Sequence, residues 1–521
     1  MIVNFKGGFF MYALTTAQMQ ALERYTIETI GIDGGTLMEI AGNAVVMALR
    51  EHELLTHERI AIVCGTGNNG GDGFVIARRL IDLGYDVRIG LAVEEQQLRG
   101  DAKTQYHILK RRGIPVTLLI EEVQTTAWLA SCAVLIDCLL GTGASGALRG
   151  HMTWLIPLIN ALEKMVVAID LPSGLHANSG EVVDAAIEAD YTLTLAQPKI
   201  GCYLQQASHY IGELIVVDIS VPETLVDTLH MTAPTIVTPA LVKAALPARP
   251  LDGHKGTFGH GAVIGGSQHY VGAPLYSAKA AFHSGIGLIS LIVPEGLMPS
   301  MMLQAPEVLL KSAASEDGYM TKEGVALHDF TKIRAVAFGP GLGRAAQLQE
   351  VAAWLLALEG PETIIVDADG LYMMKPLLQH VRATGKCVIL TPHPGEMAML
   401  CDTTIAEIEQ HRFSYARDLA QKFGVYVLLK GHRSIVATPD GAQWLIPIGS
   451  SALGKGGSGD VLTGLILSFV TQRVPAEQAL YTAAYLQAET AEKLAAQHSH
   501  YSVTPEMVVT HLGQLIACFV K

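Results

Sequence analysis

The sequence predicts a protein of the α/β class with two domains, each built on a mostly parallel sheet that helices cover. Apolar runs of strand length alternate with longer helix-compatible segments, and this series begins twice along the chain. The 521 residues also exceed the roughly 250–300 residues at which a single hydrophobic core stops growing. Half of the residues are hydrophobic and only 16% are charged, which supplies apolar surface for two cores and argues against disorder.

The predicted strands form two series that are rich in Val, Ile and Leu. The first series comprises residues 59–64, 87–91, 133–138, 165–169 and 191–195. The second comprises residues 262–264, 288–293, 335–338, 363–366, 388–390 and 425–429. Continuous apolar runs without polar alternation are typical of strands buried on both faces, which is the arrangement of a parallel sheet between helices.

A proline-rich segment separates the two series. Residues 221–259 contain Pro222, Pro234, Pro239, Pro247 and Pro250. Proline is unfavourable in helix interiors and in central strands, so this segment is the expected linker region. We place the boundary near 225–240 and assign residues 1–228 to the first domain and 229–521 to the second.

Composition excludes several classes of protein. The formal net charge of −13 disfavours nucleic acid as a partner, because nucleic-acid-binding proteins usually carry a basic excess. No apolar run reaches the ~18 residues of a membrane span, and the start of the chain lacks the long apolar region of a signal peptide. The seven cysteines form no CxxC pair and are expected to be free thiols in a reducing cytoplasm.

A glycine loop follows the first predicted strand and precedes a helix-compatible segment. Gly65, Gly67 and Gly70 match the G-x-G-x-x-G pattern of dinucleotide-binding loops, in which a phosphate lies at a helix N-terminus. The pattern alone is weak evidence, and residues 141–146 match it too. A dehydrogenase also needs an acid at the end of the next strand. Asp86 falls before that strand, so an ordinary NAD-dependent dehydrogenase is disfavoured.

Polar side chains follow three of the predicted strands. They are Asn68, Asn69 and Asp72 after the first strand, Asp137 near the end of 133–138, and Asp170 with Ser173 after 165–169. Ligands bind outside the carboxyl ends of strands in open α/β sheets, so these side chains are expected to converge. Their oxygen atoms suit a hard cation. The alternative is that each is only a helix cap or turn residue.

These motifs resemble the amino-terminal domain of the bifunctional NAD(P)H-hydrate repair enzymes, over roughly residues 15–225. The resemblance implies a Rossmann-like three-layer sandwich that interconverts the R and S hydrates of NADH and NADPH and binds potassium. Asn69, Asp137 and Ser173 would hold the potassium ion, and Asp170 would act at the reacting ring. The hydrate would be enclosed by Asn68, Asn69, Gly70, Gly71, Asp72, Gly141, Thr142, Gly143, Ala144, Ser145, Gly146, Ala147 and Asp170. Lys199 is a further candidate, and its alternative is a solvated surface lysine.

The second half contains the strongest motif, Gly454-Lys-Gly-Gly-Ser-Gly-Asp460, before a helix-compatible segment. Consecutive glycines expose backbone N–H groups at a helix start, which makes an anion hole for a transferring phosphoryl group. Asp460 in the first helical turn is placed to accept a proton from an attacking hydroxyl. A Walker loop is excluded, because Gly456 replaces the Ser or Thr that binds magnesium.

Three further loops follow strands of the second series: 339–343, 391–396 and 430–434. They resemble, in order, the loops of the ribokinase-like dehydratase domain of the same enzymes, over roughly residues 240–515. That resemblance implies that Lys430, Gly431, His432, Arg433, Ser434 and Gly459 contact ADP or ATP, with Mg²⁺ neutralising the phosphates. It also implies that Ala273, Gly343, His393 and Asp460 contact the S hydrate, and that Asp460 is catalytic.

The expected protein is therefore a cytoplasmic two-activity enzyme, in which phosphorylation of the ring hydroxyl and elimination restore NAD(P)H. Its partners would be small molecules and further copies of itself in a homo-oligomer. Two alternatives remain: a ribokinase-like small-molecule kinase with a non-catalytic first domain, and a scaffold role for that domain. The choice between ADP and ATP, the magnesium ligands and the start of translation at Met1 or Met11 are not decided by the sequence.

Overall fold

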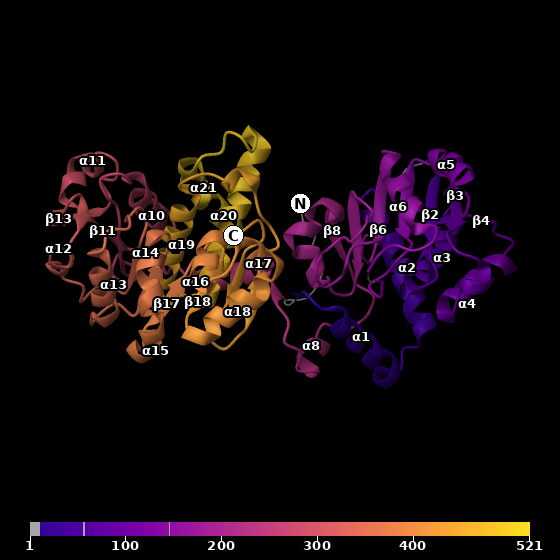
Figure 1. Ribbon diagram of the computed structural model, residues 1–521, viewed down its shortest axis with the longest axis horizontal. Helices are drawn as coiled ribbons and strands as arrows, with labels where there is room; N and C mark the ends of the chain where they lie inside the picture. The colour runs from indigo at the N-terminus through magenta and orange to yellow at the C-terminus, as the bar shows by residue number, and fades with distance from the viewer. Residues whose placement is uncertain (1–10, 56–57, 145, 521) are drawn as a thin grey trace. The chain divides into compact units, whose positions relative to one another are not determined.

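The computed structural model describes residues 11–55, 58–144 and 146–520. The chain separates into two compact units, residues 1–233 and 234–521 (Figure 1). Both units are α/β, as the sequence predicts. Ser145 and the residues around Met1 lie outside the described part of the chain.

The sheet of the first unit is parallel throughout, in the order β4-β3-β2-β5-β6-β7-β8. Its strands are β2 (Ile60–Cys64), β3 (Val87–Leu91), β4 (Val116–Leu118), β5 (Val134–Cys138), β6 (Met165–Ile169), β7 (Tyr191–Leu195) and β8 (Glu213–Val217). The chain runs outward from β2 to β4 and then returns to place β5 on the other side of β2. The order of strands thus reverses between β2 and β5, and the crevice at such a switch point is where α/β sheets bind ligands.

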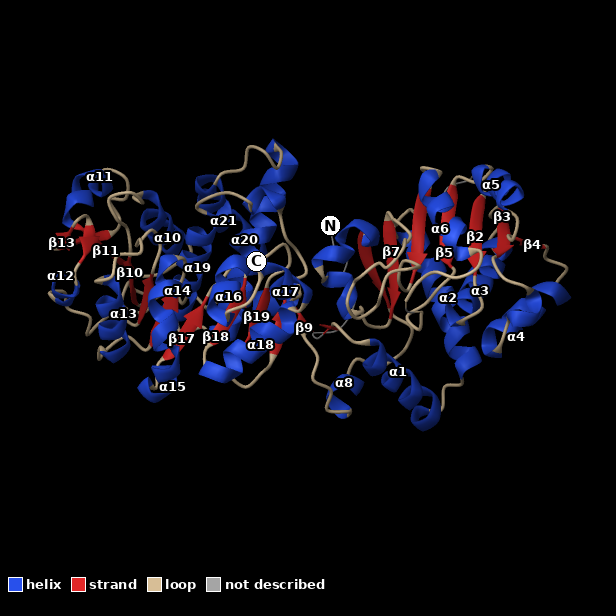
Figure 2. Cartoon of the chain, in the orientation of Figure 1, coloured by secondary structure: helices blue, strands red, loops and turns tan. Residues whose placement is uncertain are grey.

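Helices cover both faces of this sheet (Figure 2). The longer described helices of the first unit are α1 (Thr16–Tyr25), α2 (Gly34–Glu51), α3 (Asn68–Asp82), α4 (Gly100–Arg111), α5 (Glu122–Ala130) and α6 (Met152–Ala161). Alternate residues of each strand point to opposite faces. Ile60 and Ile62 therefore join the core beneath α1 to α4, whereas Ala61 and Val63 join the core beneath α5 and α6. This gives the three layers that the sequence predicts.

The sheet of the second unit follows the order β9-β20-β19-β18-β17-β16-β15-β10-β11-β12. Its strands are β9 (Thr235–Ile236), β10 (His260–Ile264), β11 (Leu288–Pro294), β12 (Leu309–Ala313), β15 (Ala335–Phe338), β16 (Thr363–Val366), β17 (Cys387–Leu390), β18 (Tyr426–Leu429), β19 (Ile435–Ala437) and β20 (Gln443–Leu445). The strands from β18 to β12 are parallel, and β19 pairs antiparallel with both β18 and β20.

The helices that matter for the second unit's site are α10 (Gly272–His283), α14 (Asp369–Met374), α16 (Pro394–Cys401), α18 (Arg412–Phe423), α19 (Ser458–Thr471) and α20 (Ala476–His498). Helix α19 is buried along almost its whole length. Its Gly464 packs against α10, where an added Cβ would lie 2.1 Å from the carbonyl oxygen of Ser277. This close approach fixes the N-terminus of α19, which carries the glycine loop, against the rest of the unit. No described helix is long and apolar enough to span a membrane.

Candidate active sites

The two glycine loops of the first unit pack directly against one another. Gly65 follows β2, and a Cβ at this position would lie 1.8 Å from the carbonyl oxygen of Leu139, in the loop after β5. A Cβ on Gly70 would lie 2.2 Å from the carbonyl oxygen of Gly65. Only glycine fits such contacts, so the pattern that the sequence shares with dinucleotide-binding loops is explained here by the closeness of the backbone segments.

A cavity of about 490 Å³ opens at this switch point. The predicted residues that line it are Asn68, Asn69, Asp72, Gly141, Thr142, Gly143, Ala144 and Asp170. The remaining predicted glycines, Gly70 and Gly71, are buried inside α3. Gly146 and Ala147 do not line the cavity, although they belong to the same loop as Gly141. The side chains that follow β2, β5 and β6 therefore converge as the strand order requires.

Asn69, Asp137 and Ser173 are buried polar side chains that are linked at one edge of the cavity, Asn69 through the backbone of Leu140 and the other two directly. The Ser173 hydroxyl donates to Asp137 Oδ1 at 2.7 Å, and the Ser173 backbone N–H donates to Asp137 Oδ2 at 2.8 Å. Burial raises the pKa of Asp137 to about 6, although these hydrogen bonds oppose the shift. Asn69 Nδ2 donates to the carbonyl oxygens of Leu140 and Ile169.

Asn69 Oδ1, by contrast, is a buried acceptor that no donor reaches within the described residues. A buried acceptor without a partner is costly. Together with the neighbouring carboxylate and hydroxyl, it offers the oxygen donors that a hard cation needs. The predicted potassium ligands therefore fit a cation chemically.

Asp170 forms an ion pair with Lys199. Lys199 is only 1% exposed, and it also donates to Thr194 Oγ1 at 3.3 Å and to the carbonyl oxygen of Leu195 at 3.2 Å. The alternative that Lys199 is a solvated surface lysine is wrong, because the residue precedes a short 3₁₀ turn that carries it into the core. Asp170 itself adopts a left-handed backbone with φ of 69°, a strained conformation that is common at functional sites.

A second cavity, of about 630 Å³, lies at the N-terminus of α19 in the second unit. The predicted residues that line it are His393, Lys430, Gly431, His432, Ser434, Gly459 and Asp460. Gly457 precedes α19 with φ of 98°, a left-handed conformation that favours glycine. The loop therefore turns sharply and presents the first N–H groups of α19 to the cavity. Arg433 is buried and does not line the cavity.

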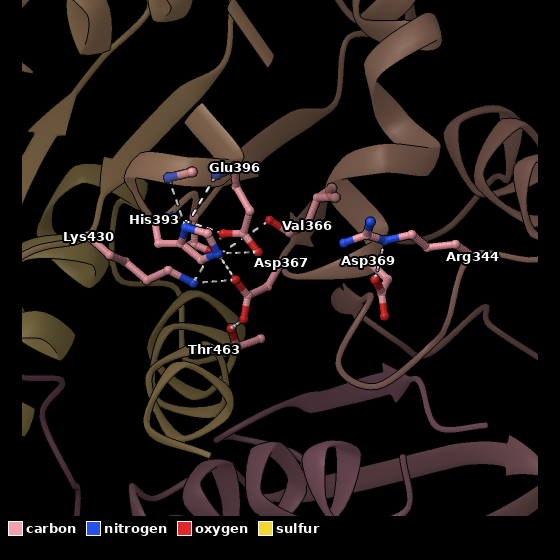
Figure 3. Close-up of polar contacts among 10 residues, drawn as sticks. Arg344, Val366, Asp367, Asp369, His393, Glu396, Lys430 and Thr463 are labelled. Atoms are coloured by element: carbon pink, nitrogen blue, oxygen red, sulfur yellow. Dashed lines mark hydrogen bonds and ion pairs between the residues drawn. The ribbon is translucent and has the colours of Figure 1, made fainter. Parts of the chain in front are cut away.

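Lys430 and Asp367 form the centre of a charged network beside this loop (Figure 3). Lys430 Nζ lies 2.7 Å from Asp367 Oδ1 and 3.8 Å from Glu396 Oε2. Thr391 and Thr463 each donate to Asp367 at 2.8 Å. Burial lowers the pKa of Lys430, but the two carboxylates outweigh burial and the pKa is raised, so the ammonium stays charged.

Asp460 lies in the first turn of α19 with its carboxyl in the same cavity. Burial and the nearby Asp367 and Glu396 carboxylates raise the pKa of Asp460 to about 7, while Lys430 opposes the shift. A carboxyl with a pKa near neutrality is well suited to accept a proton from a substrate hydroxyl. The backbone carbonyl oxygen of Asp460 accepts a hydrogen bond from Ser277 Oγ at 2.9 Å, which ties this turn to α10.

His393 is the N-cap of α16. Its Nδ1 accepts hydrogen bonds from the backbone N–H groups of Gly395 and Glu396, at 3.0 and 3.2 Å. The imidazole is 57% exposed and lies beside the Glu396 carboxylate (Figure 3). The flanking prolines and the cap hold the ring in place, as the sequence predicts for a ligand contact.

The other predicted hydrate contacts surround the glycine loop after β15. A Cβ on Gly341 would lie 3.1 Å from the Ala273 Cβ, and a Cβ on Gly339 would lie 1.9 Å from the carbonyl oxygen of Asp367. Gly343 N donates to Asp369 Oδ2 at 3.0 Å. Ala273, in the first turn of α10, and Gly343 do not line the 630 Å³ cavity itself. The loop of Gly343 nevertheless packs directly on the segment that bears Asp367.

Sequence reasoning assigned no role to Glu23, Asp367 or Glu396, which the fold brings to the two cavities. Asp367 ends a strand just as Asp170 does, and this position is the signal that could have pointed to it. Glu23 lies on α1, far along the chain from the glycine loops, and no local pattern marks it.

Known proteins resemble this chain over nearly its whole length. A bifunctional NAD(P)H-hydrate repair enzyme of Moorella thermoacetica is 34% identical over 496 residues, which cover 94% of this chain and 93% of that protein. The chain belongs to the family of bifunctional NAD(P)H-hydrate repair enzymes. A second family member, from Thermofilum pendens, is 32% identical over 97% of this chain and 96% of its own length.

The two halves of the chain match different family models. Residues 34–201 match the family model described as the YjeF-related protein N-terminus, and residues 262–513 match that of NAD(P)H-hydrate dehydratase. The ADP/ATP-dependent NAD(P)H-hydrate dehydratase of Bacillus subtilis, co-crystallised with ATP and Mg²⁺, is 30% identical with a TM-score of 0.50. The match covers 56% of this chain and 99% of that one. The alternative of a ribokinase-like small-molecule kinase with a non-catalytic first domain is therefore not favoured.

Proposed function

We propose that the first unit interconverts the R and S hydrates of NADH and NADPH, and that the second unit dehydrates the S hydrate with ADP or ATP. The observation that carries the proposal is the presence, in one chain, of two chemically complementary cavities. One contains a lysine-paired carboxylate at a sheet switch point. The other contains a partly buried acid at a glycine-rich helix start.

In the second unit, Asp460 removes the proton from the ring hydroxyl of the S hydrate while the hydroxyl oxygen takes the terminal phosphoryl group. The N–H groups at the start of α19 face the transferring group and stabilise its charge. Hydroxide is a poor leaving group, whereas phosphate is a good one. Loss of phosphate from one ring carbon and of a proton from its neighbour then restores the dihydronicotinamide.

Lys430 Nζ lies 3.4 Å from a Cβ added at Gly459, and its ammonium is suited to a phosphate oxygen. Magnesium would arrive with the nucleotide phosphates and needs few protein ligands. The Glu396 and Asp367 carboxylates, both in this cavity, supply the hard oxygen atoms and excess negative charge that suit it. Its chemical contribution when bound is to neutralise phosphate charge.

Dehydration should depend on pH through Asp460. The base must be ionised, and the pKa of Asp460 is raised to about 7, so the rate should increase as the pH rises through about 7 and level off above it. The measurement is the initial rate of S-hydrate dehydration between pH 5 and 9 at saturating nucleotide, over the range in which bell-shaped profiles report such groups. A rate that is constant across this range would contradict the assignment.

In the first unit, Asn69, Asp137 and Ser173 would hold a potassium ion below the hydrate. Its contribution there would be a fixed positive charge near the bound hydrate, which the protein's own residues position. Asn69 links the loops after β5 and β6 through its two hydrogen bonds to Leu140 and Ile169. One of the proposed ligands therefore also joins two segments that border the cavity.

Epimerisation should be faster, or saturate at lower hydrate concentration, in potassium than in sodium, and Asp137→Ala should remove this difference. The reason is the loss of the only carboxylate in the proposed ligand set. The measurement is R/S interconversion followed by chromatography in matched potassium and sodium buffers. The dehydratase rate of the same variant serves as a folding control. Wild-type behaviour of Asp137→Ala in both salts would show that the ion is held elsewhere or not at all.

The two proposed activities can be tested separately on the full chain. Purified S hydrate should be converted to NADH or NADPH only when ADP or ATP with Mg²⁺ is added. Purified R hydrate should yield S hydrate without any nucleotide. Interconversion that requires nucleotide, or dehydration that proceeds without it, would contradict the assignment of one reaction to each unit.

A further inference from the structure

Asp72 is a carboxyl that the hydrate-binding prediction leaves without a chemical role. It lies in α3, is only 7% exposed, and lines the 490 Å³ cavity of the first unit. No hydrogen bond or ion pair joins its side chain to another residue of the described chain. A carboxylate this deeply buried would normally be paired, because an unpaired buried charge is costly. The neutral acid is the form that this environment favours.

The groups that face Asp72 come from five different elements. Burial raises the pKa of Asp72 well above its usual range, and the carboxylates of Asp170 and Glu23 add to this shift, while Lys199 opposes it. The remaining titratable neighbours are the buried thiols of Cys64 on β2 and Cys138 on β5. Both thiols are neutral, since burial raises their pKa values as well.

Asp170 has the opposite environment in the same cavity. It pairs with the Lys199 ammonium and accepts a hydrogen bond from the backbone N–H of Leu195 at 3.2 Å. Both interactions stabilise an ionised carboxylate. Asp72 and Asp170 thus have different surroundings within one cavity, an unpartnered one and a lysine-paired one, which is how enzymes divide acid and base roles between two carboxyls.

We propose that Asp72 is the proton donor, and Asp170 the proton acceptor, in the interconversion of the R and S hydrates. The proposal rests on the epimerase function proposed above and deepens it. Asp72 is then a catalytic residue, and Lys199 is a positioning residue that acts through Asp170.

The two hydrates interconvert by loss and return of water at one ring carbon. Asp72 gives its proton to the ring hydroxyl, the carbon–oxygen bond breaks, and water leaves with the bonding electrons. The ring nitrogen lone pair forms a carbon–nitrogen double bond, which leaves a cation that the Asp170 and Asp72 carboxylates stabilise. Water adds to the opposite face of the same carbon, and Asp170 takes its proton. In the reverse direction the two carboxyls exchange roles.

The test is Asp72→Asn in the full chain, with Asp82→Asn as the matched control. Asp82 ends the same helix, and its carboxylate forms a surface ion pair with Arg112. Loss of a general acid should slow interconversion by about 10²–10⁴-fold, with the hydrate concentration for half-saturation changed only a few-fold. S-hydrate dehydration and the melting temperature of Asp72→Asn should stay near those of the wild type. In Asp82→Asn, interconversion, dehydration and melting temperature should all stay near those of the wild type.

The pH profile separates catalysis from a structural role. Because Asp72 acts as an acid, wild-type interconversion should slow as the pH rises through the pKa of Asp72, and this alkaline limb should disappear in Asp72→Asn. Asp72→Glu, which keeps a proton donor, should retain an alkaline limb and recover part of the rate. Interconversion by Asp72→Asn near the wild-type rate, or a slow rate with the alkaline limb unchanged, would overturn the proposal. Absence of interconversion in the wild type would instead overturn the epimerase function itself.

Discussion

Asp460→Asn should slow dehydration of the S hydrate by at least about 10²–10⁴-fold, the usual loss for a general base, while adenine-nucleotide binding survives. Asp460 is partly buried in the cavity that Asp367 and Lys430 also line. Burial and the neighbouring carboxylates raise the pKa of Asp460 to about 7. An amide in its place keeps the shape but cannot remove the hydroxyl proton. Nucleotide binding should depend instead on the N–H groups at the start of α19 and on the loop from Lys430 to Ser434.

Calorimetry with ADP and ATP should give affinities within a few-fold of the wild type, and thermal melting should show a folded protein. Asp402→Asn is the matched control, because the Asp402 side chain is 81% exposed and pairs with Lys375 at the surface. If Asp460→Asn dehydrates the S hydrate at close to the wild-type rate, Asp460 merely stabilises the start of α19. Such a role is worth about 0.3–1 kcal/mol and leaves the proposed phosphoryl transfer without its base.

Asp170→Asn should stop R/S interconversion and leave dehydration of the S hydrate nearly intact. The variant removes the proton acceptor and also leaves the buried Lys199 ammonium without its counter-charge. Uncompensated buried charges cost several kcal/mol, so part of the effect is a displaced Lys199. Asp460 belongs to the other compact unit, so its chemistry should not change.

The measurement is chromatography of the two hydrates for interconversion and the appearance of NADH for dehydration, on the same preparation. Asp86→Asn is the matched control, since its carboxylate is 54% exposed and pairs with Arg59 at the surface. Equal loss of both activities in Asp170→Asn would show that the two reactions share one site.

The α/β fold was predictable because buried parallel strands leave a plain signal. The runs that became β2, β6 and β16 are apolar almost throughout and rich in Ile and Val, which is typical of strands buried on both faces. β19 and β20 are three residues each, too short for any periodicity. The antiparallel pairing of β19 with β18 and of β20 with β19 depends on tertiary contacts, which a local sequence pattern does not encode.

The candidate sites were predictable where a local motif coincides with a strand end, as at Asp170 and Asp460. Asp72 belonged to the predicted glycine loop, but its raised pKa depends on burial and on the carboxylates of Asp170 and Glu23, which lie far away in sequence. The burial of Lys199 could not be predicted either, because a lysine after a proline normally indicates a surface turn. The raised pKa of Asp72 and the burial of Lys199 are set by distances between segments that are remote in sequence. A local sequence pattern holds no information on those distances.

The most direct test of the two-activity account starts from purified R hydrate alone. With the full chain, Mg²⁺ and ADP or ATP, the near-ultraviolet absorbance of the reduced nicotinamide should return completely, because epimerisation feeds the dehydratase. Asp170→Asn should restore absorbance only at the uncatalysed rate of interconversion, and Asp460→Asn should accumulate S hydrate without restoring it. If the wild-type chain leaves R hydrate unchanged while it rapidly dehydrates S hydrate, the first unit is not an epimerase and the account is wrong.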